Sequence, residues 1–179
     1  APDAELYFHA YGGNSEYFKQ AVSTLANAGC NIICDDLYFF RQPFLEDGDV
    51  ADHIRDVLKT YPNLIYVTVS GNFASLHYQK PWKSGISIGP DQTLHDFGEG
   101  NSAVQLTLVP RDEVIVTLQW DDPWGGAVHD YDLFLTDPSR GEVVATSMNI
   151  QNDTAEPFEH LVFRNDGTES RRVSLSIVR

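Results

Sequence analysis

The sequence predicts a mixed fold, in which an α/β part with a parallel sheet precedes an all-β part, an antiparallel β-sandwich of the jelly-roll kind. In the first half, apolar runs of strand type alternate with segments of helical period, an order typical of parallel sheets with right-handed crossovers. From Ser102 onward no helical period remains, and short alternating runs follow one another between turn residues. We therefore expect an α/β domain at residues 1–97 and a β-sandwich domain at 98–179.

The first half contains three expected strands and two expected helices. Asn14 is a suitable N-cap for the first helix, whose apolar residues recur at helical spacing as far as Gly29, a residue typical of the position after a helix. The second helix is expected from Val50 to Tyr61 and is stopped by Pro62. The strands are expected at 4–11, 31–34 and 64–69.

The second half is expected to contain only strands. Each run alternates apolar with polar or small residues, and turn residues such as Pro110-Arg111-Asp112 lie between the runs. The segment from about Phe73 to Gly100 has little periodicity and is expected to join the two halves. The expected strands are 104–108, 114–118, 131–135, 143–145, 160–163 and 173–178.

Charge and composition exclude several classes of protein. The 179 residues include 12 Lys and Arg against 26 Asp and Glu, a formal net charge of −14. An acidic chain lacks the basic footprint that nucleic-acid binding needs, and anionic membrane surfaces are disfavoured for the same reason. No apolar run approaches the roughly 20 residues of a membrane span. The opening Ala1-Pro2-Asp3 has no basic region, so we expect no signal peptide in this chain.

The two cysteines, Cys30 and Cys34, are expected to be free, buried thiols. On an extended strand their Cα atoms would lie about 13 Å apart, at roughly 3.3 Å per residue. A disulfide requires a separation under about 7 Å.

Ser70-Gly71-Asn72 is the best-placed candidate for chemistry. It follows the third expected parallel strand, and open α/β sheets build their sites at the carboxyl ends of their strands. An asparagine amide is a neutral donor that can stabilise an oxyanion there. The alternative is that Asn72 forms an Asx turn that closes the strand.

Five segments together resemble a subtilisin-like serine peptidase with an inserted β-sandwich. Their order and spacing match the central part of that family, over nearly the whole chain. The segments are 29–37 (Gly-Cys-Asn-Ile-Ile-Cys-Asp-Asp-Leu), 42–48 (Gln-Pro-Phe-Leu-Glu-Asp-Gly), 67–72 (Val-Thr-Val-Ser-Gly-Asn), 119–125 (Gln-Trp-Asp-Asp-Pro-Trp-Gly) and 130–135 (Asp-Tyr-Asp-Leu-Phe-Leu).

The resemblance implies roles for particular residues. Asn72 would be the oxyanion-hole amide and would act on a protein or peptide substrate. The residues expected to bind that substrate are Asp36, Leu37, Tyr38 and Gly71. The chain departs from the common pattern, which has small residues where Tyr38, Phe39 and Phe73 stand, and these rings would narrow or fill the pocket.

The catalytic triad of that family has no counterpart in this chain. No Gly-Thr-Ser, His-Gly-Thr or Gly-x-Ser-x-Gly segment occurs, and the scattered histidines are not expected to act as catalytic bases. The isolated chain is therefore expected to be inactive as a peptidase. It would be active only with the remainder of the peptidase domain as its partner. The resemblance also implies an extracellular or cell-surface location. The histidines are His9, His53, His77, His95, His129 and His160.

A second group of candidate residues is acidic. These residues are possible ligands of Ca²⁺, which is the only cofactor that the sequence suggests. On a strand, Asp130 and Asp132 would point to one face, and clustered carboxylates suit hard cations. The alternative is that these aspartates form a solvent-exposed turn at the start of the strand and bind no ion. The possible calcium ligands are Asp121, Asp122, Asp130 and Asp132.

A non-enzymatic interpretation stays open beside the peptidase one. A pseudopeptidase or surface interaction module would keep the scaffold and bind protein or carbohydrate through the sandwich. Aromatic residues at expected loops, such as Trp120 and Trp124, either form a binding surface or pack between subdomains.

Overall fold

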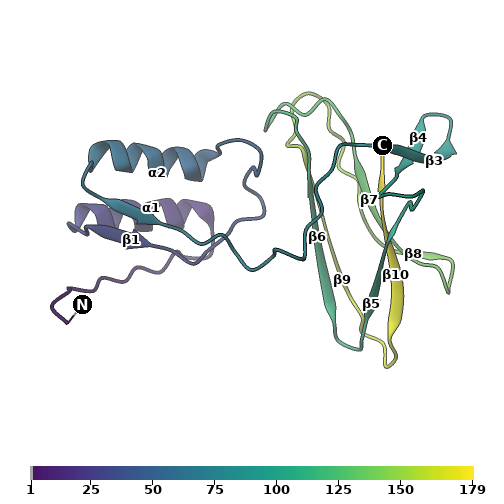
Figure 1. Cartoon of the computed structure of the whole chain (residues 1–179), viewed down its shortest axis with the longest axis horizontal. Helices are drawn as coiled ribbons and strands as arrows, with labels where there is room; N and C mark the ends of the chain where they lie inside the picture. The colour runs from purple at the N-terminus through teal and green to yellow at the C-terminus, as the bar shows by residue number, and fades with distance from the viewer. Residues whose placement is uncertain (1) are drawn as a thin grey trace. The chain divides into compact units, whose positions relative to one another are not determined.

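The computed structural model describes residues 2–179 and divides into two compact units, which part between Tyr78 and Gln79. The fold is mixed α/β and mainly β, with two helices and several antiparallel pairings (Figure 1). Within the described residues, neither helix has the length and apolar character needed to cross a membrane. The sequence predicts a domain boundary after residue 97. The second unit begins earlier, at Gln79. The reason is that two strands, Ser84–Gly89 and Gln92–His95, lie in the segment that the sequence predicts to be a connection.

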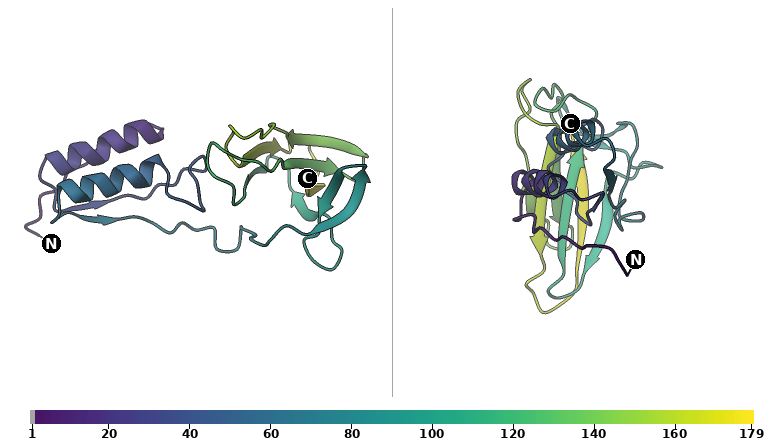
Figure 2. Two further views of the ribbon diagram at one scale, coloured as in Figure 1. Left: turned by 90° about the horizontal axis from the view of Figure 1, so that it is seen from above. Right: turned by 90° about the vertical axis from the view of Figure 1, so that its left-hand side faces the viewer.

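The first unit alternates helices and strands in the expected order. Its two strands pair in parallel, with Ile32 opposite Ile65 and Cys34 opposite Val67, which confirms the expected parallel pairing. Both helices lie on the same side of this pair (Figure 2, left). The elements are α1 (Ser15–Asn27), β1 (Ile32–Cys34), α2 (Asp49–Thr60) and β2 (Ile65–Val67).

The helix ends follow the capping signals. Asn14 caps α1, because its side-chain oxygen accepts a hydrogen bond from the backbone N–H of Tyr17 at 3.0 Å. Gly29 has a φ of +87°, the left-handed conformation that commonly follows a helix. The buried faces of the helices then pack on the inner face of β1. This core consists of Phe18, Val22, Ala26, Ile33, Val57 and Leu64.

The strand expected at 4–11 does not form. This segment carries no strand pairing, and the side chains of Leu6 and Phe8 are 94% and 92% exposed. A strand needs a neighbour that satisfies its backbone N–H and C=O groups. Within residues 2–179, β1 pairs only with β2, so the alternating sequence of this segment is left without a partner.

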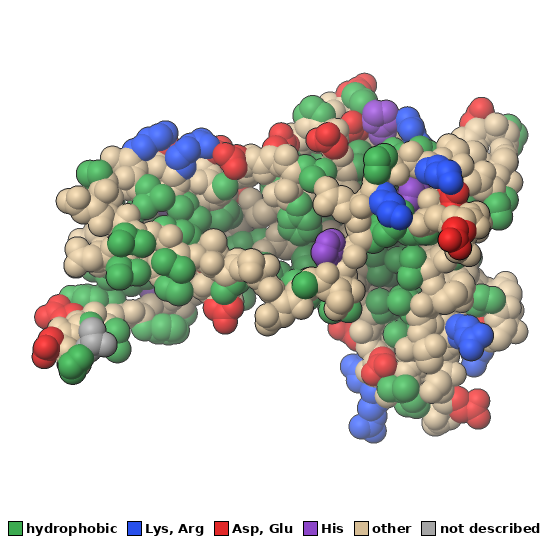
Figure 3. Space-filling view, viewed as in Figure 1, with side chains coloured by type: hydrophobic (Ala, Val, Ile, Leu, Met, Phe, Trp, Pro, Cys, Tyr) green, Lys and Arg blue, Asp and Glu red, His purple; other side chains and the backbone are tan. Residues whose placement is uncertain are grey.

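One face of the β1–β2 pair is apolar and exposed. Ile33 points toward the helices and is buried, whereas its neighbours point the other way. Ile32, Ile65 and Val67 are 62%, 57% and 46% exposed. Cys30 and Cys34 are free as expected, but neither is buried: Cys30 is half-buried, and Cys34 is exposed because it lies on this face. Figure 3 shows exposed apolar side chains near the N-terminus of the same unit. Parallel sheets normally have both faces covered.

The second unit is built from antiparallel strands. In its larger sheet, β10 pairs with β7 along one edge and with β5 and β4 along the other. The β7–β8 and β3–β4 pairs extend this sheet, and β6–β9 forms a separate two-stranded sheet. The strands are β3 (Ser84–Gly89), β4 (Gln92–His95), β5 (Val104–Leu108), β6 (Glu113–Gln119), β7 (Asp132–Asp137), β8 (Glu142–Ser147), β9 (Phe158–Arg164) and β10 (Arg171–Val178).

All six strands expected after residue 102 are present, and their inward side chains share one core. The larger sheet contributes Leu133, Leu135 and Val173, and Leu161 comes from the two-stranded sheet. Leu135 and Val173 are completely buried. The hairpin β3–β4 was not expected, although Gly89-Pro90-Asp91 is a turn signal and Ile86 and Ile88 alternate with small residues before it.

A buried ion pair fixes the end of the larger sheet. Asp137 on β7 accepts two hydrogen bonds from the Arg171 guanidinium on β10, at 3.0 and 2.9 Å. The Ser139 hydroxyl and backbone N–H also bond to this carboxylate, at 2.6 and 3.0 Å. Together the Ser139 and Arg171 contacts hold the pKa of Asp137 well below its usual value. The charge is thus buried together with its partners, the condition under which a buried carboxylate is tolerated.

The core of the second unit depends on Leu135. We expect Leu135→Ala to lower the free energy of unfolding by about 2–5 kcal/mol, because it removes a fully buried side chain and leaves a cavity. Val143→Ala on the adjacent strand is the matched control, since Val143 is 56% exposed, and it should stay within about 0.5 kcal/mol of the wild type. Urea unfolding of both variants measures this, and equal losses would contradict the assignment of the core.

Candidate functional site

Hydrogen bonds of Asp35 join the carboxyl end of β1 to that of β2. Its backbone N–H bonds to the Val67 carbonyl at 3.1 Å, which continues the pairing beyond β1. Its carboxylate accepts hydrogen bonds from the Tyr66 hydroxyl, the Thr68 hydroxyl at 3.0 Å and the Leu37 N–H at 3.2 Å. Burial and the Asp35 carboxylate raise the pKa of Tyr66, so this phenol stays a hydrogen-bond donor. The Asp35 hydrogen bonds therefore fix the first residues of both the loop after β1 and the loop after β2.

Aromatic contacts join these two loops a few residues further on. The Tyr38 ring lies edge-on to the Phe73 ring, with the centroids 4.9 Å apart, and Phe40 contacts both rings at 4.8 and 5.9 Å. Tyr38 is 55% exposed and Phe73 is 37% exposed, so the group presents an apolar surface. Leu37 packs on the core of the first unit instead, and its N–H is bonded to Asp35, so neither its side chain nor its N–H is left for contact with a ligand.

Gly71 and Asn72 belong to the second of these loops. Gly71 has a φ of +73°, a conformation that glycine adopts without strain. Asn72 is exposed, and no residue among 2–179 forms a hydrogen bond with its side chain. Asp36, in the loop after β1, is also exposed. The geometry thus leaves the Asn72 amide available, and it does not have the Asx-turn hydrogen bond of the alternative interpretation.

Among the acidic residues, Asp122 is committed to its own loop. Its carboxylate accepts hydrogen bonds from the Trp120 indole at 3.1 Å and from the backbone N–H groups of Val128 and His129 at 3.0 and 2.8 Å. The His129 ring lies 2.9 Å from the other oxygen. Burial alone would raise the pKa of Asp122, but these donors outweigh it and lower the pKa. Asp121 beside it is exposed.

Asp130 and Asp132 lie near a third carboxylate, Glu159. Asp130 accepts a hydrogen bond from the Gln151 N–H at 3.2 Å. Glu159 is completely buried, and its oxygens are occupied by Ser147, by both Asn149 donors and by Gln151. Burial, followed by the charges of Asp130 and Glu159, raises the pKa of Asp132 to about 6. Within residues 2–179 no three Asp, Glu, His or Cys side chains are arranged to hold a metal ion, and calcium binding stays a prediction.

The tryptophans of the second unit pack mainly against other rings. Trp82 and Trp120 lie 5.1 and 5.0 Å from the Tyr131 ring, and Trp124 lies 6.2 Å from Phe158. All three are half-buried, and Tyr131 is only 9% exposed. These contacts all lie within the second unit, so the rings belong to its own packing. They give neither the expected packing between subdomains nor an open aromatic platform for a sugar.

The structure also brings together a pair that the sequence did not reveal. Ser23 on α1 and His53 on α2 form a hydrogen bond of 2.8 Å between the hydroxyl oxygen and Nε2. Thirty positions separate them, and no short motif contains both. The contact does not test the expectation that no histidine acts as a catalytic base, which stays a prediction. The helical periods of the two segments predict an apolar face on each helix, but they do not predict that Ser23 and His53 meet.

A scan against models of known families, a search of curated proteins and a search of solved structures each found no match to this chain.

The raised pKa of Asp132 predicts a pH dependence of stability. The folded chain holds this proton up to a pH of about 6, whereas the unfolded chain releases it near 3.8, so ionisation of Asp132 reduces stability as pH rises between these values. We therefore expect Asp132→Asn to stabilise the chain at pH 7 relative to the wild type, with the gain disappearing by pH 4. Urea unfolding at both pH values measures this. Asp121→Asn, an exposed control, should show no such difference, and an equal effect at the two pH values would contradict the prediction.

Proposed function

We propose that this chain is the central portion of a subtilisin-like serine endopeptidase. It would supply the oxyanion-hole asparagine and the strand that receives the substrate backbone, while the Ser–His–Asp triad comes from other segments. The observation that carries the proposal is the exposed Asn72 amide, which follows the second of two parallel strands and has no hydrogen-bond partner among the described residues. A neutral donor at that edge is suited to a carbonyl oxygen that gains negative charge.

The apolar face of the β1–β2 pair supports a partner for the first unit. Ile32, Ile65 and Val67 lie side by side on the face that the helices do not cover. Leaving three large apolar side chains in water is unfavourable, at about 1.5–3 kcal/mol for each fully exposed side chain. We assign this face to the remainder of the peptidase domain, which would also add strands to the pair.

The loops after β1 and β2 support a peptide as the substrate. Asp36, Tyr38 and Gly71 lie in these loops, with the Tyr38–Phe73 contact between them. The rings occupy space that small residues leave open in the family, so we propose a narrow cleft that accepts an extended peptide with a small side chain next to the scissile bond.

We assign an accessory role to the second unit. Its two sheets share one core, which supports a jelly-roll-like β-sandwich. Such a module would control access to the cleft or stabilise the peptidase, and an extracellular or cell-surface location agrees with the family resemblance.

The oxyanion assignment predicts a specific kinetic defect. In a peptidase domain that contains this chain together with the triad segments, Asn72→Ala should lower kcat by about 10²–10³-fold with little change in KM. The known measurement of this size is for the matching asparagine of subtilisin, so the magnitude is adopted from it. Steady-state hydrolysis of a chromogenic peptide provides both constants.

Asn63→Ala is the matched control, because Asn63 is an exposed asparagine in the turn before β2. It should leave both constants unchanged. An unchanged kcat in Asn72→Ala would remove the oxyanion assignment. A coding region without triad segments on either side would favour the non-catalytic interaction module instead. The isolated chain should hydrolyse no peptide in either case.

A further inference from the structure

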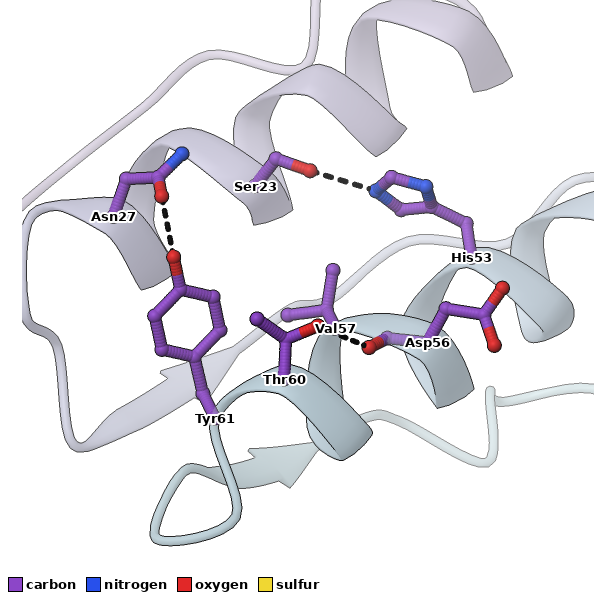
Figure 4. A pocket seen from close by; sticks show the side chains of 7 residues that line it. All are labelled: Ser23, Asn27, His53, Asp56, Val57, Thr60 and Tyr61. Atoms are coloured by element: carbon purple, nitrogen blue, oxygen red, sulfur yellow. Dashed lines mark hydrogen bonds between the residues drawn. The ribbon is translucent and has the colours of Figure 1, made fainter.

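The Ser23–His53 pair lies outside everything that the proposed peptidase function uses. The two side chains come from facing helices, α1 and α2, and point toward each other across the space between them (Figure 4). Both are half-buried, and the distance of 2.8 Å joins the hydroxyl oxygen directly to a ring nitrogen. A hydroxyl within hydrogen-bond reach of an imidazole is the arrangement of a nucleophile and its base.

The pair borders an open hollow of about 270 Å³ that is lined by both polar and apolar side chains. Asn27 lies one helical turn beyond Ser23, on the same side of α1. The Asn27 carbonyl oxygen accepts a hydrogen bond from the Tyr61 hydroxyl, so its amide nitrogen points away from Tyr61 (Figure 4). The hollow is thus lined by a hydroxyl, an imidazole and an amide group.

We propose that Ser23 and His53 form an acyl-accepting site for small, uncharged esters with good leaving groups. Ser23 Oγ attacks the ester carbonyl while its proton passes to His53 Nε2. The tetrahedral intermediate then collapses: the bond to the leaving oxygen breaks, the protonated His53 gives its proton to that oxygen, and the alcohol or phenol departs, which leaves acyl-Ser23 and a neutral His53. Water then attacks the acyl-serine carbonyl, gives a proton to His53 and releases the acid, after which Ser23 regains its proton from His53.

Two features of the hollow define this substrate class. Its volume of about 270 Å³ is sufficient for a short acyl group. Among residues 2–179 no carboxylate accepts a hydrogen bond from the His53 ring, so the base has no orienting acid and the leaving group must be a good one. Asp56, also at the hollow, is paired with Lys59 at 2.9 Å, so the pair adds no net charge there and an uncharged substrate needs no counter-ion.

Incubation of the full 179-residue chain with p-nitrophenyl acetate tests the proposal. We expect a burst of p-nitrophenolate and one acetyl group on Ser23, located by peptide mass mapping. Ser23→Ala should lose the adduct, and His53→Gln should slow acylation by about 10²-fold or more, because it removes the general base. Thr24→Ala, which removes an exposed hydroxyl from the next position of α1, should behave like the wild type.

Circular dichroism of each variant establishes that it is folded. If Ser23→Ala unfolds, Ser23→Cys keeps the size of the side chain and should carry the acetyl group on sulfur. Absence of an adduct on Ser23 in the folded wild type would overturn the proposal. An acylation rate unchanged in His53→Gln would also overturn it, as would acetylation confined to lysine or histidine.

Discussion

One carboxylate determines where the loops of the first unit begin. Asp35 follows β1 directly and bonds to Tyr66 and Thr68 on the segment of β2, as well as to the backbone at Leu37. Each strand has only three residues, so backbone pairing alone provides few hydrogen bonds. The Asp35 contacts add side-chain bonds where the pairing ends, and charged acceptors form stronger hydrogen bonds than neutral ones. The positions of Tyr38 and Asn72 both depend on this junction.

The second unit also contains carboxylates that join separate segments through hydrogen bonds. Glu159 and Asp137 are almost completely buried carboxylates, and each is surrounded by donors from other segments. Leaving such a charge without partners would be strongly unfavourable, so these residues favour one register of the strands over its neighbours. Asp132 differs from Asp137, because burial acts on it without comparable donors, and the pKa of Asp132 rises whereas that of Asp137 falls.

The sequence predicted the parts of the fold that depend on local pattern. The helices α1 and α2 and the six later strands were identified from periodicity, and Asn14 and Gly29 from capping preference. The prediction failed where structure depends on a neighbour. The segment 4–11 alternates like a strand but has no partner, and the hairpin β3–β4 is too rich in glycine and serine for a clear pattern. The site was predicted only as far as Asn72 could be placed after a strand, while the Asp35 junction and the Ser23–His53 contact join residues about 30 positions apart.

The ring contact between Tyr38 and Phe73 has a mechanical consequence. Because the rings meet edge to face, the loops after β1 and β2 cannot separate without breaking an interaction of about 0.5–1.5 kcal/mol, with Phe40 adding contacts to both sides. Displacement of one loop is therefore transmitted to the other. A ligand that inserts an apolar group between these rings would replace the ring–ring contact with contacts of its own. The two loops could then separate without exposing aromatic surface to water.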